Sequence, residues 1–239
     1  MSGSIADRLA AVTDEIARAA LAVGRDPESI ELVVVSKTRS PEEIALAIRG
    51  GARLLGENYV QEARRKIPEV AALLPDHRAR WHVIGPLQTN KAKYVPGTFD
   101  EVESVDRADL GDALAKRAEA AGIVLPVLVQ VNVGREPQKS GCDPDSVHEL
   151  LARLSQQRSL AVGGLMAIPP EAEDPEASRP WFRALATLAR DLAGRGLLPA
   201  APVLSMGMSH DFTVAIAEGA TRVRVGTAIF GPRAPRPDA

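Results

Sequence analysis

The feature that most constrains this chain is the regular alternation of short apolar runs with longer segments of helical period. Several of the runs are almost continuously apolar, as strands covered on both faces are. Strands that alternate with helices need crossover connections, which give a parallel sheet. The expected strands are Glu31–Ser36, Arg53–Leu55, Trp81–Ile84, Glu101–Val105, Pro126–Val133, Gly163–Ile168, Val203–Met206 and Arg222–Val225.

Helix-start signals lie between these runs. The segment Ser40-Pro41-Glu42-Glu43 combines a capping serine, a first-turn proline and the glutamate of a capping box. Asp106 and Asp143 predict two further helix starts by the same chemistry. The other expected helices are Ser4–Val23, Glu57–Leu74, Ala177–Leu192 and Ser209–Glu218.

Length and element order together predict the fold. A chain of 239 residues is close to the usual size of a (β/α)8 barrel, which is about 250 residues. We predict an α/β protein with a single (β/α)8 TIM barrel as one domain over residues 1–239. An extra leading helix within residues 1–25 precedes the barrel, and residues 232–239 form a flexible tail. No Gly-x-Gly-x-x-Gly motif follows the first strand, which argues against an open dinucleotide-binding sheet.

Composition excludes several classes of protein. The 29 basic and 31 acidic side chains leave a net charge of −2, and aromatic residues make up only 3%, so we expect no nucleic-acid partner. Cys142 is the one cysteine, and the four histidines are not clustered, so we predict neither an internal disulfide nor a metal site. No signal peptide and no membrane-length apolar run is visible. We therefore expect a cytoplasmic protein without a membrane partner.

Lys37 is the first candidate for chemistry. Active sites of such barrels lie at the carboxyl ends of the strands, and Lys37 directly follows the run Val33–Val35. A lysine at an apolar barrel mouth loses hydration, so we expect its pKa to fall. A neutral amine can attack a carbonyl and form a Schiff base. The alternative is a lysine whose stem packs while its ammonium reaches water.

Two segments after the seventh and eighth expected strands suggest a phosphate site. They are Gly207-Met208-Ser209 and Gly226-Thr227, and barrels often hold phosphate between these two loops. Ser209 can cap a helix whose N-terminus attracts anions, and Gly226 lets the backbone approach a ligand closely. The alternative is a pair of ordinary turns with a routine helix cap.

Arg224 is the third candidate. It alternates with Val223 and Val225, and Arg222 shares its face of the strand. A buried guanidinium needs a partner because an unpaired buried charge is costly. A salt bridge to a helix carboxylate is the simplest alternative to a ligand, and we expect one for Arg222 in particular.

Other polar or soft side chains are weaker candidates. We expect His82 to be a packed, hydrogen-bonded histidine, and Met166 and Met206 to fill the core or the pocket. Cys142 and Lys139 share a loop in which no partner base is evident.

A reactive lysine, a phosphate cradle and a barrel together indicate a site for pyridoxal 5′-phosphate (PLP). Motifs in a familiar order run through nearly the whole chain, and on them the sequence resembles the pyridoxal phosphate homeostasis protein family. The matching segments are Val34–Thr38, Gly56–Glu62, Trp81–Lys91, Lys139–Gly141, Gly164–Met166, Leu204–Ser209 and Val223–Gly231.

The resemblance implies a barrel akin to the N-terminal domain of alanine racemase, and a role for each matching residue. Lys37 would carry the Schiff base, and Asn58 would line the ring pocket. Arg224 would face the pyridine nitrogen, with His82, Met166 and Met206 as weaker pocket candidates. The residues expected to hold the phosphate are Ser209, Gly226 and Thr227. His210 stands where an acidic residue is expected, which changes the charge near the phosphate.

Three functions stay open. The first is a monomeric protein without catalytic residues that buffers PLP or delivers it to PLP-dependent apoenzymes. An arginine opposite the pyridine nitrogen disfavours ring protonation and weakens the carbanion sink, and the chain ends at Ala239, where we expect no second racemase-like domain. The second is a PLP-dependent amino-acid racemase-like enzyme. The third is a cofactor-free Schiff-base aldolase acting on a sugar phosphate, which would leave Arg224 without a role.

Overall fold

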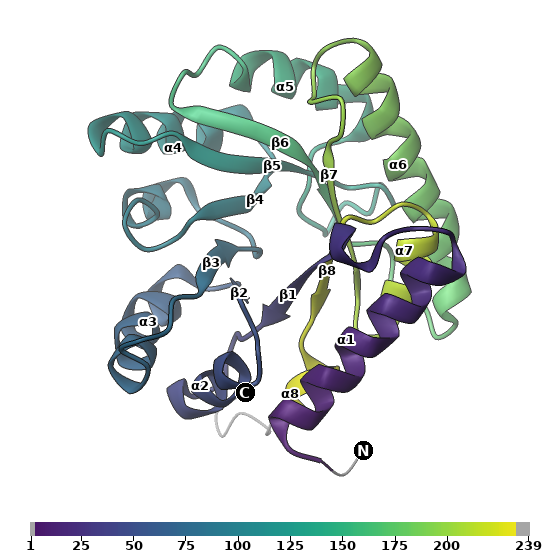
Figure 1. Cartoon of the computed structure of the whole chain (residues 1–239). Helices are drawn as coiled ribbons and strands as arrows, with labels where there is room; N and C mark the ends of the chain where they lie inside the picture. The colour runs from purple at the N-terminus through teal and green to yellow at the C-terminus, as the bar shows by residue number, and fades with distance from the viewer. Residues whose placement is uncertain (1–2, 233–239) are drawn as a thin grey trace.

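The strands form a closed parallel barrel in sequence order, with β8 beside β1 (Figure 1). The computed structural model describes residues 3–232, so the predicted tail lies outside the described residues from position 233 onward. The predicted (β/α)8 TIM barrel is confirmed. The strands are β1 (Glu31–Val35), β2 (Leu54–Glu57), β3 (Arg80–Val83), β4 (Glu101–Val105), β5 (Leu125–Val131), β6 (Leu160–Ala167), β7 (Val203–Met208) and β8 (Arg222–Val225).

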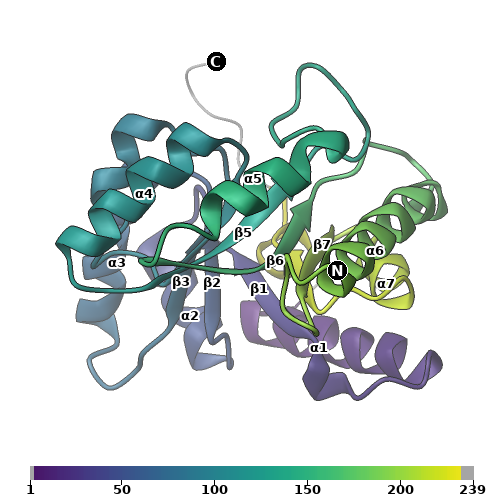
Figure 2. The same cartoon turned by 90° about the horizontal axis from the view of Figure 1, so that it is seen from above.

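Helices surround this barrel. The α-helices are α1 (Ile5–Ala22), α2 (Pro41–Arg49), α3 (Val60–Leu73), α4 (Ala108–Ala120), α5 (Val147–Leu154), α6 (Arg179–Gly194), α7 (Phe212–Ala217) and α8 (Thr227–Phe230). Short 3-10 helices are η1 (Pro27–Ser29), η2 (Thr89–Tyr94), η3 (Pro144–Ser146) and η4 (Pro175–Ser178). Seen from above, the strands lie between α3 and α4 on one side and α6 and α7 on the other (Figure 2).

The strand alternation divides the apolar residues between two clusters. Outward-facing side chains such as Val34 and Leu55 join the large core between the sheet and the helices. Val33, Leu54 and Ile84 form a separate small cluster. Because successive strand residues point to opposite faces, this second cluster lies inside the barrel and fixes which side chains of β1 face inward.

Most of the predicted helix starts follow the capping chemistry. Ser40 and Glu43 form the predicted capping box, and Ser4 caps α1 in the same way. Asp143 caps η3 by accepting a hydrogen bond from a backbone N–H. The start predicted at Asp106 is wrong, because α4 follows Arg107 and has no side-chain cap.

The predicted start of the third helix at Glu57 is also wrong. β2 continues through Gly56 and Glu57, which pair in register with His82 and Val83 of β3. α3 therefore begins only at Val60. Strand pairing overrides the helix-forming preference of a single glutamate.

α1 braces the two helices that follow β7 and β8. It lies beside α7 and α8 in Figure 1, although these segments are far apart in the sequence. Arg8 Nε donates to the carbonyl of Ile229 at 2.5 Å, at the end of α8. Arg25, three residues beyond the end of α1, donates from Nη1 to the carbonyls of Ile216 in α7 and Ala220 just after it, at 3.0 and 2.8 Å. The leading helix and the residues that follow it thus hold α7 and α8 against the barrel.

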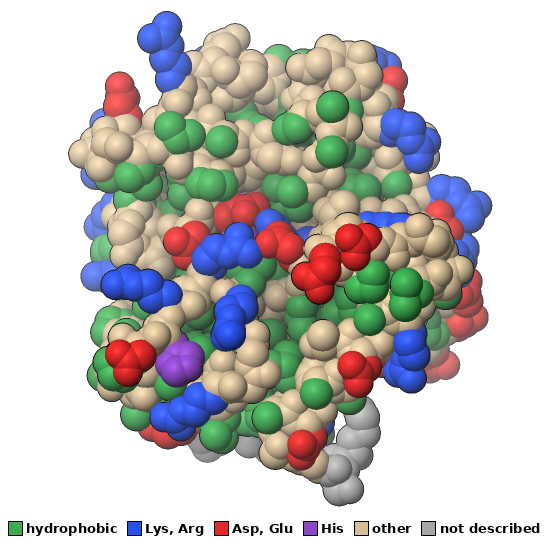
Figure 3. All heavy atoms as spheres, in the orientation of Figure 1, with side chains coloured by type: hydrophobic (Ala, Val, Ile, Leu, Met, Phe, Trp, Pro, Cys, Tyr) green, Lys and Arg blue, Asp and Glu red, His purple; other side chains and the backbone are tan. Residues whose placement is uncertain are grey.

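The surface carries mixed charge. Figure 3 shows acidic and basic side chains interspersed on the face drawn there, in keeping with the nearly balanced composition. Within residues 3–232, no helix combines the length and the apolar character needed to cross a membrane.

Candidate functional site at the barrel mouth

The carboxyl ends of β8, β1 and β2 bring three of the candidate residues together. Val35 pairs with Gly56 of β2, and Lys37 and Asn58 each lie two residues beyond that pair. On the other side, a Cβ added to Gly226 would lie 3.2 Å from Val35 Cβ and its carbonyl oxygen. A side chain at position 226 would therefore fill this edge of the mouth. Lys37 thus follows a strand that runs between those of Asn58 and Gly226.

Lys37 is half-buried and follows Val33 and Val35 on the inward face of β1. The next residue, Thr38, has a φ of 64°, a left-handed conformation that is uncommon for a β-branched residue. Such a conformation persists only where the surroundings hold it, and it occurs often at functional sites. The turn after β1 is therefore imposed by its contacts.

The Ser209 hydroxyl faces the end of β8. Its Oγ accepts hydrogen bonds from the backbone N–H groups of Gly226 and Ala228, at 3.2 and 3.4 Å. The prediction that Ser209 caps the next helix is wrong, because α7 begins at Phe212. The chain first makes a turn in which Asp211 Oδ1 accepts from a backbone N–H, so Ser209 is left free to face β8.

Thr227 begins α8 directly after Gly226, and its side chain is exposed. The two predicted phosphate segments therefore meet across one hydroxyl group, Ser209 Oγ. Backbone N–H groups that converge on one oxygen are the arrangement that binds a phosphate oxygen.

Arg224 is 3% exposed and lies inside the barrel. Its Nη1 donates to Ser205 Oγ at 2.7 Å, and its Nη2 donates to the carbonyl of Ala167 at 2.9 Å. Both acceptors are uncharged, so burial lowers the pKa of Arg224 despite the opposing charges of Glu103 and Asp211.

Arg222 lies one layer deeper and is paired with carboxylates. Its guanidinium donates to Glu101 Oε1 at 2.8 Å, Glu103 Oε1 at 3.0 Å and Glu31 Oε2 at 2.7 Å. The predicted partner on a helix is wrong, because Arg222 faces the barrel interior, where these strand residues lie. His82 Nδ1 lies 2.8 Å from Glu103 Oε1, as predicted for a packed, hydrogen-bonded histidine.

Glu103 links the two arginine layers. Its Oε2 accepts from Ser205 Oγ at 2.5 Å, and Ser205 in turn accepts from Arg224. Burial alone would raise the pKa of Glu103, but the His82 hydrogen bond and the charge of Arg222 lower it to about 2. The ligand atoms of His82, Glu101 and Glu103 lie within 4.8 Å of one another, but Arg222 occupies both carboxylates. The group is therefore an ion-pair network.

Comparison with known proteins identifies the family. The family model for the alanine racemase N-terminal domain matches residues 9–234. The pyridoxal phosphate homeostasis protein of Aquifex aeolicus is 45% identical over 227 residues, which cover 95% of this chain and 97% of that protein. This chain belongs to the pyridoxal phosphate homeostasis protein family. The resemblance inferred from the motifs is confirmed.

Other members of the family show the same extent of likeness. The Escherichia coli pyridoxal phosphate homeostasis protein is 42% identical over 231 residues, covering 96% of this chain and 97% of that one. The structure of PipY from Synechococcus elongatus with PLP bound has a TM-score of 0.81 and 36% identity, over 95% of this chain and all 100% of that chain.

The two methionine candidates lie on opposite sides of the sheet. Met166 pairs in register with Ser205, which faces the barrel interior. Met206 is fully buried in the large core between the sheet and the helices. Strand alternation thus separates Met206 from the inward-facing residues.

A cavity of about 830 Å³ lies at the ends of β6 and β7, and its lining includes Met208 and His210, the two neighbours of Ser209 in the sequence. Lys139 lines it, with its Nζ 2.6 Å from Glu136 Oε2 and 3.1 Å from the Pro169 carbonyl. His210 also lines it and contacts the carbonyl of Glu173 at 2.8 Å. Near this loop, burial raises the pKa of the Cys142 thiol to about 12, which keeps it protonated and unreactive.

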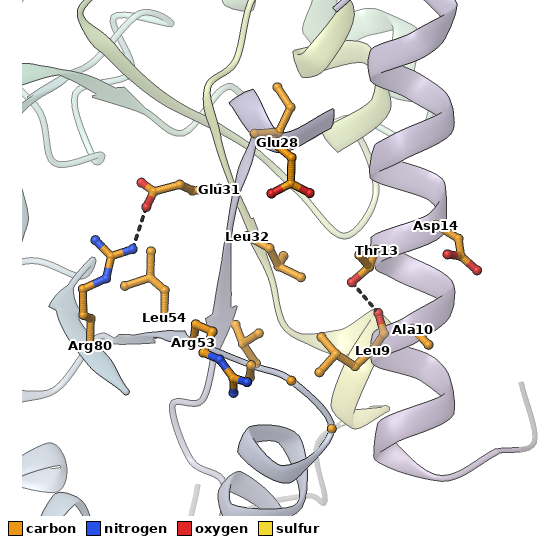
Figure 4. A pocket seen from close by; sticks show the side chains of 15 residues that line it. Leu9, Ala10, Thr13, Asp14, Glu28, Glu31, Leu32, Arg53, Leu54 and Arg80 are labelled. Atoms are coloured by element: carbon orange, nitrogen blue, oxygen red, sulfur yellow. Dashed lines mark hydrogen bonds and ion pairs between the residues drawn. The ribbon is translucent and has the colours of Figure 1, made fainter. Parts of the chain in front are cut away.

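A second cavity of about 590 Å³ lies at the opposite end of the barrel, between α1 and the amino ends of β1 and β2 (Figure 4). At its rim Glu31 Oε1 pairs with Arg80 at 2.6 Å. Arg222 reaches the other oxygen of Glu31 from inside the barrel. The lining of this second cavity includes none of the candidate PLP residues.

Proposed function

We propose that this chain binds PLP at the barrel mouth and buffers or delivers it, with Lys37 as the amine that bonds to the cofactor. PLP supplies an aldehyde, which condenses with an amine with loss of water, and a phosphate that can be gripped separately. The observation that carries the proposal is the convergence of the Gly226 and Ala228 N–H groups on Ser209 Oγ, beside β1, the strand that leads to Lys37. The PLP-bound PipY structure and the names of the relatives support it.

The residues of the mouth fit the parts of this cofactor. Ser209, Gly226 and Thr227 would hold the phosphate through the hydroxyl groups and the backbone N–H groups. Asn58 would line the ring pocket between Lys37 and the third strand, where a Cβ on Gly85 would lie 2.6 Å from Asn58 Cα. Met166 would form an inner wall, whereas His82 would act indirectly through Glu103.

Arg224 would face the pyridine nitrogen. It is fixed by Ser205 and Ala167, and it is a cation, so it disfavours protonation of that nitrogen. An unprotonated ring is a weaker electron sink, which favours binding over turnover. The relatives are named homeostasis proteins, which agrees with this interpretation.

Absorbance tests the proposal. Titration of the purified wild type with PLP should produce the visible absorbance band of a cofactor bonded to lysine. Lys37→Ala should lose the band, whereas Lys116→Ala, which changes an exposed lysine of α4, should keep it. A wild type that takes up no PLP rejects the proposal. In heavy water, rapid hydrogen exchange at the α-carbon of an added amino acid would instead support a racemase-like enzyme.

We also propose that the protein forms one domain and works as a cytoplasmic monomer that passes PLP to PLP-dependent apoenzymes. The single cysteine and the mixed surface charge agree with this setting. Light scattering should give the monomer mass. Mixing the loaded protein with an apoenzyme should restore the apoenzyme's activity faster than the same concentration of free PLP does.

A further inference from the structure

A buried ion cluster lies behind the turn that carries Lys37. It consists of Ser36, Glu57, Lys66 and Glu62, between the outer face of β1 and β2 and helix α3. Lys66 is 5% exposed and Glu57 is fully buried. Burial raises the pKa of Glu57, against the charge and hydrogen bond of Lys66 and the hydrogen bond of Ser36. None of these residues is part of the proposed cofactor contact surface.

The Lys66 ammonium has three acceptors within hydrogen-bond distance. Its Nζ donates to the Ser36 carbonyl at 2.8 Å and lies 2.8 Å from both Glu57 Oε1 and Glu62 Oε1. An ammonium has three N–H donors, so this set of partners is complete. The Ser36 hydroxyl donates to Glu57 Oε1 at 2.5 Å, which closes the cluster on β1.

The cluster holds the backbone on both sides of Lys37. The Ser36 carbonyl bonds to Lys66 directly. The Thr38 N–H donates to Glu62 Oε1 at 2.6 Å, and Glu62 is itself paired with Lys66. Thr38 has the left-handed φ of 64°, which a threonine adopts only under constraint. One buried ammonium thus fixes the two peptide groups that flank the candidate amine.

The cluster lies on the outer face of the sheet, whereas the proposed ligand site lies at the barrel mouth. Val33 and Val35 face the barrel interior, and the same alternation predicts an inward side chain for Lys37, while the Ser36 carbonyl bonds to Lys66 of α3. Lys66 therefore acts on Lys37 through the backbone. A buried ion pair is weak evidence for stability, because apolar replacements are often as stable. Fixing a particular turn is a better account of why these charges are buried here.

We propose that Lys66 is a positioning residue, which holds the Ser36–Thr38 turn so that Lys37 points at the cofactor aldehyde. This inference rests on the proposed function. Lys66 would touch neither the phosphate nor the ring, so its loss should slow the bond to Lys37 and leave the non-covalent contacts intact. Small misplacements of a reacting group are known to cost up to about a hundredfold in rate.

The test separates bond formation from binding. Pyridoxamine 5′-phosphate has the same ring and phosphate but no aldehyde, so its affinity reports non-covalent binding only. In Lys66→Met we expect the rate at which PLP becomes borohydride-trappable on Lys37 to fall roughly tenfold or more. The affinity for pyridoxamine 5′-phosphate should stay within about threefold. Lys116→Met is the matched control and should change neither quantity.

Two outcomes overturn the inference. One is a trapping rate in Lys66→Met that stays within about twofold of the wild type. The other is an equal loss of affinity for both ligands, which would indicate a general role in the fold. If Lys66→Met fails to fold, Glu62→Met removes the acceptor of the Thr38 N–H and one of the three Lys66 partners but leaves the Ser36 and Glu57 contacts in place, and the same two quantities decide. A wild type that binds pyridoxamine 5′-phosphate but forms no bond with PLP rejects the proposed function itself.

Discussion

Arg222 and Arg224 lie two residues apart on β8 and face the same barrel interior, yet their surroundings differ. Arg222 is paired with three carboxylates, and the charges of Glu103 and Glu101 raise its pKa although burial opposes this. Among the described residues, the Arg224 guanidinium donates to a hydroxyl and a carbonyl, and burial lowers its pKa. In the deeper layer, the Arg222 cation is paired with carboxylates. In the layer at the mouth, the hydrogen-bond acceptors of the Arg224 cation are uncharged. We infer that the first serves stability and the second serves the ligand.

The largest expected effect is on the deeper layer. Arg222→Met leaves Glu31, Glu101 and Glu103 without their common cation, so the free energy of unfolding should fall by about 3–5 kcal/mol. Urea denaturation measures this loss. Arg153→Met is the control, because Arg153 is half exposed and solvent screens its surface pair with Asp112. Equal losses in the two variants would refute the contrast.

Acid should weaken the same layer. The pKa of Glu103 lies at about 2 in the fold, against an ordinary 4.5. The ionised Glu103 therefore stabilises the fold fully above pH 4.5, and this stabilisation is lost as the pH falls toward 2. The difference corresponds to roughly 3 kcal/mol. Urea denaturation between pH 5 and pH 2 should show a steeper loss for the wild type than for Glu103→Gln. Parallel curves would contradict this account.

Arg224→Met should cost less stability and more function. Its partners are uncharged, so the free energy of unfolding should fall by about 1–3 kcal/mol, less than for Arg222→Met. The affinity for PLP should fall by about tenfold, equal to about 1.4 kcal/mol. Arg224→Lys keeps the charge but loses the planar guanidinium, so its affinity for PLP should lie between those of the wild type and Arg224→Met. A variant with wild-type affinity would remove Arg224 from the ligand's surroundings.

The smallest effect is expected at Ser209. Its hydroxyl is half-buried and accepts two long hydrogen bonds, so Ser209→Ala should change the free energy of unfolding by less than about 1 kcal/mol. The affinity for PLP should still fall by about two- to tenfold, because a phosphate ligand is lost. Titration followed by absorbance measures it. Loss of stability without loss of affinity would favour a purely structural turn.

The barrel could be predicted from the sequence because the patterns that indicate it are local. The apolar runs and the Ser40 capping box each involve a few neighbouring residues, and the structure follows both. Lys37 and Gly226 could be placed at one barrel end because parallel strands share a direction. The direction of Ser209 depends on a turn at Asp211, which periodicity does not report.

The buried networks were missed for a related reason. The partners of Arg222 come from β1 and β4, so their contacts exist only after the barrel has closed. The alternation of Glu101 and Glu103 along one strand was a usable signal, because it puts two carboxylates on one face. The sequence carries no comparable signal for Lys66, since the ammonium of a lysine on an amphipathic helix usually reaches water.

The most direct test of the whole account is the site of the covalent bond. The wild type is loaded with PLP, reduced with borohydride, digested and analysed by mass spectrometry. We expect the added mass on the peptide that contains Lys37, and none on peptides that contain Lys66 or Lys139. An adduct mainly on another lysine, or no adduct at all, would contradict the proposal that this barrel mouth holds the cofactor.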